Sequence, residues 1–348
     1  MMFFKQVRLH SYGYELPERE LSSAQIEYWL TPLYERLKLP KGRLELMSGI
    51  TTRRLWEPPR KPSQAAAGAG RNALARAGVD PGEIECLICT SVSRDMLEPA
   101  TASFVHHELG LSSRCLIYDL SNACLGFLDG MLMLATMIDA GNLNNGLIVS
   151  GETAEDLIES TIAALLADPE LTRKDIKPAF ASLTIGSGAV AWYLCKTSSS
   201  TTSMPLLSHG CWRAQTNHID LCQGDRYGGS TTLMATNSEE LLVQGVETAQ
   251  LTWHDFIATG GWELDEIDHY FCHQVGSAHA RLLMERLALD PAKNFETLAT
   301  LGNVGSVSAP LTMALAMEQE VFRPGQKAAL LGIGSGINCL MAGVTWPS

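Results

Sequence analysis

The sequence predicts an α/β fold built from two similar halves, and two observations lead to this prediction. From about residue 84 onward, strand-like apolar runs alternate with helix-like segments, the order typical of an α/β protein. The same order of elements returns in the second half at similar spacing, which indicates a duplicated unit. The composition agrees, because 46% hydrophobic and 18% charged residues in a chain of 348 exclude a disordered or fibrous protein.

In the first half, strands are expected where short apolar runs are bounded by polar loops. These runs are residues 84–90, 115–120 and 146–151. Between the last two, residues 123–140 carry Leu, Met and Ile at helical spacing, which predicts a buried helix. A charged helical segment is expected at 155–166.

The second half repeats this arrangement. Strands are expected at 267–272, 328–333 and 339–346, and helices at 277–288 and 308–321. The Ser- and Thr-rich stretch before them indicates a surface loop between the halves. We therefore divide the chain into two domains, 1–196 and 197–348.

The halves can be laid on each other at the level of single motifs. Residues 84–91 match 267–274, and residues 147–151 match 330–334. Chance similarity between buried strands is the alternative to duplication. The loops that follow such strands are where α/β folds place their chemistry.

Charge and cysteine content narrow the class of protein. The net charge of −12 argues against nucleic-acid binding through the general surface. We expect no membrane span and no signal peptide, since the N-terminus mixes charged and apolar residues. Nine cysteines then indicate a reduced, cytoplasmic protein. Cys86 and Cys89 form a C-x-x-C in a strand-like run, and we expect them to be buried structural thiols.

Three polar residues lie in loops that enter or follow the predicted elements. Cys124 begins the apolar helix, where a helix N-terminus would lower the pKa of a nucleophilic thiol. His273 follows a strand, and Asn303 precedes a helix. Each alone also fits a structural role, as a buried thiol, a packed imidazole or a helix cap. The glycine cluster at 332–336 would present backbone N–H groups to a substrate oxygen.

Together and in this order, the motifs resemble the thiolase-fold condensing enzymes, close to 3-oxoacyl-[acyl-carrier-protein] synthase III. The resemblance covers almost the whole chain. It implies a duplicated five-layered αβαβα thiolase fold and a homodimer. The motifs that carry it are Asn122-Ala-Cys-Leu-Gly-Phe127, His273-Gln274, Gly302-Asn303, Gly332-Ile-Gly-Ser-Gly336 and Ser48-Gly-Ile-Thr-Thr-Arg-Arg54.

Within that family, residues 90–103 are most similar to the head-to-head acyl-CoA condensing enzymes of long-chain olefin biosynthesis. Residues 53–56, 151–154 and 330–339 share this similarity. In that group the position of Glu98 is a glutamate that reaches across the dimer into the partner's active site. An exposed turn before Pro99 is the structural alternative for Glu98.

The resemblance implies a Claisen condensation without decarboxylation. Cys124 would take an acyl group, with the backbone N–H groups of Cys124 and Ser335 as oxyanion hole. His273 and Asn303 would bind the carbonyl of a second thioester, and Glu98 of the partner subunit would remove its α-proton. A plain acyl thioester needs such a base, because its α C–H is only weakly acidic.

The implied substrates are long-chain acyl-CoA or acyl-ACP thioesters, with no cofactor and no metal. Arg53, Arg54 and Trp56 would meet the CoA at the entrance. Downstream olefin-pathway enzymes are possible partners. The absence of a second cysteine in the glycine loop argues against a degradative thiolase. Residues 273–279 depart from the synthase III pattern, which favours CoA over a carrier protein.

Three alternatives stay open at this stage. The chain could be a decarboxylative synthase III that uses malonyl-ACP. It could instead be a ketosynthase that forms α-pyrones or resorcinols. The third is an inactive thiolase-fold partner subunit, although such chains usually lose the nucleophile that is present here.

Overall fold

The N-terminal half contributes five strands to the framework of the computed structural model, which describes residues 1–225 and 233–348. Their order is β6-β5-β7-β8-β2. β5, β6 and β7 run parallel, whereas β8 is antiparallel to both of its neighbours. The strands are β2 (Val7–Glu15), β5 (Cys86–Cys89), β6 (Leu116–Asp119), β7 (Asn145–Glu152) and β8 (Gly188–Lys196).

The C-terminal half repeats this topology. Its strands are β9 (Leu206–Ala214), β12 (His269–Cys272), β13 (Lys327–Gly334) and β14 (Asn338–Thr345), in the order β12-β13-β14-β9. The β12–β13 pair is parallel, and β14 is antiparallel to both neighbours, as β8 is in the first half. β5, β7, β8 and β2 therefore correspond to β12, β13, β14 and β9. A short β2–β9 pairing joins the halves, and β1 (Met2–Phe3) pairs with β9.

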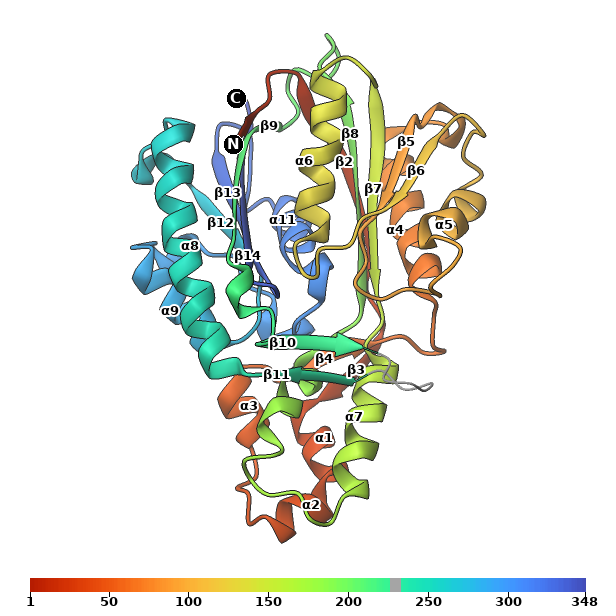
Figure 1. The fold of residues 1–348 in the computed structure, drawn as a ribbon. Helices are drawn as coiled ribbons and strands as arrows, with labels where there is room; N and C mark the ends of the chain where they lie inside the picture. The colour runs from red at the N-terminus through yellow and green to blue at the C-terminus, as the bar shows by residue number, and fades with distance from the viewer. Residues whose placement is uncertain (226–232) are drawn as a thin grey trace.

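Helices form three layers around the two halves of the sheet (Figure 1). Two of them lie between the sheets, α6 (Gly126–Asp139) and α11 (Ser308–Glu318). The outer face of the N-terminal half is covered by α4 (Pro62–Ala77) and α5 (Thr101–Leu109), and that of the C-terminal half by α8 (Ser238–Gly260) and α9 (Ser277–Arg286). The result is the expected five-layered αβαβα architecture.

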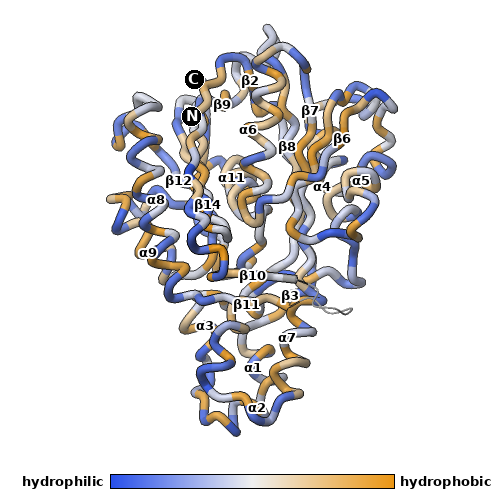
Figure 2. The backbone as a smooth tube through the Cα atoms, in the orientation of Figure 1, coloured by the Kyte–Doolittle hydropathy of each residue, from blue (hydrophilic) through white to orange (hydrophobic). Residues whose placement is uncertain are grey.

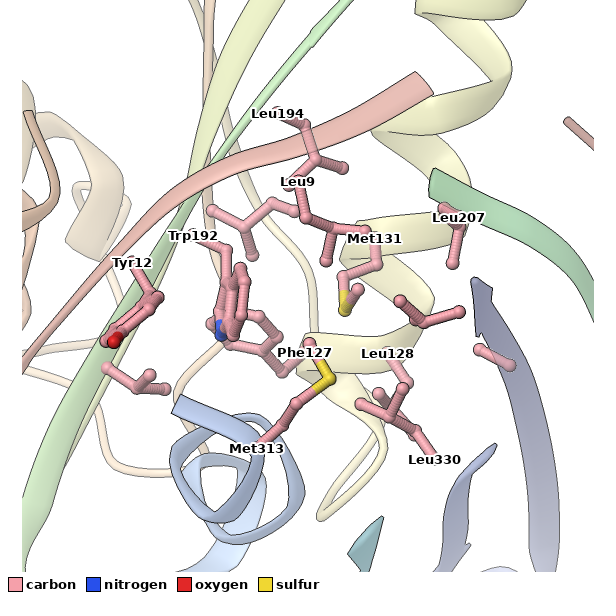
Figure 3. Close-up of a cluster of buried hydrophobic side chains, with 14 of the residues drawn as sticks. Leu9, Tyr12, Phe127, Leu128, Met131, Trp192, Leu194, Leu207, Met313 and Leu330 are labelled. Carbon is pink, nitrogen blue, oxygen red and sulfur yellow. The ribbon is translucent and has the colours of Figure 1, made fainter. Parts of the chain in front are cut away.

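The central layer explains why α6 is apolar on almost every side. Both of its faces pack against a sheet, so no broad polar face is needed. Figure 3 shows Phe127 and Met131 of α6 beside Trp192 of β8 and Met313 of α11, all fully buried. The Trp192 indole N–H donates to the Pro310 carbonyl at 3.2 Å, so even this ring has no unpaired polar group.

A smaller group of elements caps one end of the sheets, at the bottom of Figure 1. Its helices carry alternating polar and apolar residues, as Figure 2 shows, and bury one face in a separate apolar cluster. The elements are α1 (Ser23–Trp29), α2 (Thr31–Arg36), α3 (Arg43–Ser48), α7 (Glu155–Ala167), and the strand pairs β3 (Arg19–Ser22) with β4 (Thr52–Leu55) and β10 (Cys222–Asp225) with β11 (Leu233–Thr236).

The predicted strands and helices are confirmed with shifts of a few residues at their ends. Cys86 and Cys89 lie in β5 with both side chains buried, as expected for structural thiols. Burial raises the pKa of each to about 12. In the described part of the chain, no helix is long and apolar enough to cross a membrane, and no cluster of three metal-binding side chains occurs. The division at residue 196 falls between β8 and β9 and stays a prediction.

Candidate active site

Cys124 lies in the tight loop between β6 and α6. Ala123 before it has a φ of +47°, a left-handed conformation that turns the chain sharply into the helix. Gly126 begins α6, and a Cβ there would lie 2.6 Å from the Thr90 carbonyl oxygen at the end of β5. A glycine is therefore required for the helix to start this close to the sheet, and the close approach fixes the position of Cys124.

The glycine loop of the C-terminal half lies against this cysteine. A Cβ added to Gly334, the last residue of β13, would be 3.7 Å from the Cys124 backbone nitrogen and 3.1 Å from Leu125 Cγ. Ser335 follows directly. The fold therefore places the two residues predicted to form the oxyanion hole, Cys124 and Ser335, in neighbouring loops from opposite halves.

His273 follows β12 and lies beside the same end of β13. Its backbone N–H donates to the Leu331 carbonyl at 2.8 Å. The imidazole is 4% exposed, and burial lowers its pKa to about 3, with His279 adding to the effect. Among the described residues, no group lies within hydrogen-bonding distance of the buried Nδ1. The ring is thus neutral at physiological pH.

Asn303 lies in the loop that precedes α11. Its backbone N–H donates to the Thr184 carbonyl oxygen at 3.0 Å, and its side-chain Oδ1 accepts from the Gly305 N–H at 3.0 Å. The Oδ1 contact orients the amide. The next residue after Gly305 is Ser306, and its Oγ accepts a hydrogen bond from the Phe127 N–H of α6 at 3.0 Å. The loop that carries Asn303 is thereby attached to the helix that follows Cys124.

Gln274 connects the loop that carries His273 to the segment that leads to Asn303. Its Nε2 donates to the Phe295 carbonyl at 3.0 Å, and its Oε1 accepts from the Thr297 N–H at 2.9 Å. Thr297 caps the short helix α10 (Leu298–Leu301), which leads into the Asn303 loop. The glutamine next to His273 therefore fixes the chain that carries Asn303.

The expected lowering of the Cys124 pKa is wrong. Cys124 is half-buried, and desolvation of its sulfur raises the pKa of Cys124 to about 12, with the negative charge of Glu152 as a further cause. Two peptide groups separate Cys124 from the first residue of α6, and burial outweighs the favourable helix terminus. The thiol is therefore protonated at rest, and its proton must leave when the sulfur attacks.

Glu152 is the site residue that sequence reasoning missed. It ends β7 with 4% exposure, and it accepts hydrogen bonds from the Val92 N–H at 2.8 Å and from the Ser93 N–H at 3.0 Å. A Cβ at Gly305 would lie 3.3 Å from its Oε1. Burial raises the pKa of Glu152 to about 7. The available signal was a glutamate at the end of an otherwise apolar strand.

Glu98 lies apart from this enclosed group. It is exposed on the loop between β5 and α5, next to Leu97, which is 95% exposed. The nearby edge strand β6 exposes Leu116 and Ile117. Within one chain, Cys124, Ser335, His273 and Asn303 lie in buried or half-buried loops at the ends of the two halves of the sheet, whereas Glu98 is exposed.

The predicted CoA entrance is wrong for two of its three residues. Arg53 is fully buried and donates to the Leu21 carbonyl at 3.2 Å and to Ser23 Oγ at 2.9 Å. Trp56 is 5% exposed, and its indole N–H donates to the Glu152 carbonyl at 3.1 Å. Arg54 alone remains accessible, paired with Glu20 at 2.9 Å. The hairpin β3–β4 turns Arg53 inward because side chains alternate along a strand.

Comparisons with known proteins agree with this geometry. Residues 118–169 match the family model of 3-oxoacyl-[acyl-carrier-protein] synthase III, and residues 257–346 match the model of its C-terminal part. The chain is 40% identical to an acyl-CoA:acyl-CoA alkyltransferase of Shewanella oneidensis, over 99% of this chain and 100% of that protein. The corresponding Xanthomonas campestris protein is 36% identical over 99% of this chain and 100% of its own length.

Solved structures give the same result. A crystal structure of a cysteine-to-alanine variant of Xanthomonas campestris OleA has a TM-score of 0.94 at 35% identity, covering 99% of this chain and 98% of that one. A synthase III structure from Xanthomonas oryzae (FabH) has a TM-score of 0.93 at 36% identity, covering 99% and 100%. Fold and site thus define a thiolase-type condensing enzyme, an acyltransferase that forms carbon–carbon bonds. The chain belongs to the synthase III family, in the group of the acyl-CoA:acyl-CoA alkyltransferases (OleA).

Proposed function

We propose that this enzyme condenses two long-chain acyl-CoA thioesters, without decarboxylation, to a 2-alkyl-3-ketoacyl product. The observation that carries the proposal is the convergence of Cys124, Ser335, His273 and Asn303 at one end of the two sheets, in a chain whose relatives are named acyl-CoA:acyl-CoA alkyltransferases. The two reaction steps make different demands on these residues.

In the first step Cys124 Sγ attacks the carbonyl of an acyl-CoA. The carbonyl oxygen becomes negative and is stabilised by the backbone N–H groups of Cys124 and Ser335. The C–S bond to CoA then breaks, and CoA leaves as the thiol after taking up the proton lost by Cys124. Because the resting thiol has a raised pKa, attack depends on this proton transfer and on the oxyanion hole.

In the second step another acyl-CoA is deprotonated at its α carbon. The carbonyl of this second thioester accepts hydrogen bonds from His273 and Asn303 as enolate character develops. A neutral imidazole suits this role, since it donates one hydrogen bond without adding a fixed positive charge. The carbanion attacks the acyl-cysteine carbonyl, the C–S bond breaks, and Cys124 leaves as the thiol after taking up the proton removed from the α carbon.

Glu98 of the partner subunit removes the α-proton in this proposal. Two features of the single chain support a partner at this place. Glu98 and Leu97 are exposed, and the edge strand β6 presents the apolar Leu116 and Ile117 to solvent. Covering such an edge removes unpaired backbone groups and apolar surface from water. A homodimer that pairs there would also bury the Glu98 loop.

Mixed dimers test the action of Glu98 in trans. Glu98→Ala and Cys124→Ala are each expected to be inactive in condensation as pure proteins. When both chains are co-expressed, a mixed dimer has Cys124 in one subunit and Glu98 in the other, so one of its two sites is complete. Restored condensation is the expected result. If Glu98 acts within its own chain, no mixed dimer regains activity.

Mass spectrometry of the products tests the overall function. The purified protein is incubated with myristoyl-CoA alone, and both the intact protein and the extracted lipids are analysed. We expect an acyl adduct on Cys124 and a symmetric long-chain ketone. The ketone arises when water hydrolyses the 2-alkyl-3-ketoacyl-CoA product to CoA and the β-keto acid, which then loses CO₂. Enzymes that act on such β-keto acids are the expected downstream partners.

The other outcomes identify the remaining alternatives. Acylated Cys124 without ketone would indicate that the second substrate is different. Product formation only after malonyl-ACP is added would indicate a decarboxylative synthase III, and cyclised products from β-ketoacyl thioesters would indicate a pyrone- or resorcinol-forming enzyme. A Cys124 that is never acylated would indicate an inactive partner subunit.

A further inference from the structure

A series of side-chain hydrogen bonds connects the loop that carries Cys124, in the N-terminal half, to the glycine loop that carries Ser335, in the C-terminal half. Asn122 lies two residues before Cys124, and its Nδ2 donates to Asp129 Oδ2 in the first turn of α6 at 2.8 Å. Asn122 Oδ1 accepts from Asn338 Nδ2 at 3.2 Å. Asn338 Nδ2 also donates to the Ser335 carbonyl at 3.2 Å. The contact between the two asparagines joins positions 216 residues apart.

The surrounding backbone is shaped to fit this arrangement. Asn338 is the first residue of β14 and pairs with Gly334 of β13, so it lies at the base of the turn that carries Ser335. Gly336 in that turn has a φ of +127°, and a Cβ there would lie 2.6 Å from Asn338 Nδ2. The glycine thus leaves the space that the asparagine amide occupies.

The two asparagines are each attached to the backbone of one proposed donor of the oxyanion hole. The Asn122 carbonyl accepts from the Leu125 N–H at 3.0 Å, so this residue closes the turn that contains Cys124. At the other end, the bond to the Ser335 carbonyl restricts rotation of the residue whose N–H is the second donor. Beside the close approach of Gly332 and Gly334 to Leu125, the Asn338–Asn122 bond is the side-chain hydrogen bond that the described residues form between the two loops.

We propose that Asp129, Asn122 and Asn338 are positioning residues that hold the N–H groups of Cys124 and Ser335 at the spacing needed for the oxyanion hole. Asp129 fixes the amide of Asn122, because its carboxylate accepts from Nδ2 and leaves Oδ1 to face Asn338. An acidic side chain is favourable in the first turn of a helix. The inference rests on the proposed function, since an oxyanion hole matters only if Cys124 takes an acyl group.

Two reactions of the Cys124 sulfur, acylation and alkylation, distinguish a positioning role of the asparagines from a general structural role. Acylation by a thioester passes through an oxyanion and needs both N–H donors. Alkylation by iodoacetamide displaces iodide at a saturated carbon, so it needs an accessible sulfur that loses its proton but forms no oxyanion and needs neither N–H donor. Loss of one oxyanion-hole donor slows an enzyme by about 10²–10³-fold, and loss of a supporting residue costs about 10–100-fold.

The test measures both rates in Asn338→Ala, by intact-protein mass spectrometry with myristoyl-CoA and with iodoacetamide. We expect acylation to fall about 10–100-fold while alkylation stays within about twofold of wild type. Asn122→Ala breaks the same contact from the other side and serves if Asn338→Ala does not fold. Asn142→Ala, an exposed asparagine just beyond α6, is the matched control and is expected to leave both rates unchanged.

Asp129 provides the rescue experiment. Asp129→Asn keeps an oxygen that can accept from Asn122 Nδ2, so it should retain more acylation activity than Asp129→Ala. Wild-type acylation rates in folded Asn338→Ala and Asn122→Ala would overturn the inference. So would a parallel loss of alkylation, which indicates a collapsed site. If wild-type protein is not acylated at all, the proposed function fails first, and the inference falls with it.

Discussion

The two halves of the molecule place different chemistry at corresponding positions. β7 ends on Glu152, whereas the corresponding strand β13 ends on the glycine loop that carries Ser335. Cys124 precedes α6, and Asn303 lies in the loop before α11, the corresponding helix. One framework is thus used twice, and the side chains at its ends differ between the copies.

The strands β5 and β12 extend this contrast. β5 leads into the exposed loop with Glu98, while β12 leads into the buried, neutral His273. In the proposed reaction the N-terminal half therefore supplies the nucleophile and carries both carboxylates, Glu98 and Glu152, and the C-terminal half supplies neutral hydrogen-bond donors. A condensing enzyme needs both sets, because one makes and breaks bonds while the other stabilises the oxygen on which negative charge develops.

The largest expected loss of activity comes from removing the proposed nucleophile of the N-terminal half. Cys124→Ala should abolish both acyl-enzyme and product, because no other group can form the thioester intermediate. Intact-protein mass spectrometry after incubation with acyl-CoA measures this. Cys115→Ala is the matched control, since Cys115 is also partly exposed but precedes β6, at the end of that strand away from Cys124, and the variant should be acylated normally on Cys124. An acyl adduct on the Cys124→Ala protein would refute the assignment.

Glu98→Ala should separate the two steps. Condensation is expected to fall about 10²–10⁴-fold, because the α-proton loses its base, while acylation of Cys124 continues. Quantifying product and acyl-enzyme in the same sample measures both. Glu57→Gln, at another exposed glutamate with only a long contact to Arg19, should change neither. Full condensation by Glu98→Ala would show that another group is the base.

Arg53→Ala tests whether Arg53 of the N-terminal half supports the loop that carries Asn303 in the C-terminal half. Arg53 is fully buried, and its Cβ lies 3.1 Å from the position of a Cβ on Gly302, next to Asn303. Removing it leaves a cavity and unpaired acceptors, so we expect a loss of about 3 kcal/mol in the free energy of unfolding. Arg54→Ala should lose at most about 1 kcal/mol. Chemical denaturation compares them, and equal losses would contradict this reading.

Glu152 should make stability depend on pH. Its folded-state pKa of about 7 lies above the ordinary value of 4.5. Between these values the unfolded chain has lost a proton that the folded chain keeps, so stability falls as pH rises and is greatest below 4.5. The loss is at most about 3 kcal/mol.

Unfolding free energies at several pH values, in wild type and Glu152→Gln, measure this slope. The variant should be flatter between pH 4.5 and 7, with a residual slope of the same sign from Asp129 and Glu155, whose pKa values burial also raises. Glu57→Gln serves again as the control at an exposed site. An unchanged slope in Glu152→Gln would show that the carboxylate is ionised throughout this range.

Much of this protein follows from the local pattern of its sequence. The strands and helices, their repetition in two halves, and the positions of Cys124, His273 and Asn303 in the loops beside them were all predictable. Apolar runs of strand length and helical periodicity identify elements because they depend on neighbours along the chain. The loops between those elements then contained the polar residues that the site uses.

Only the tertiary structure decided how those residues behave. The raised pKa values of Cys124 and Glu152 and the burial of Arg53 all depend on groups far away in sequence. The bond between Asn122 and Asn338 likewise exists only because two halves meet. Desolvation and hydrogen bonding act through distances in space, and the sequence lists residues in the order of the chain. The site of one half is therefore completed by the other, which no segment alone could reveal.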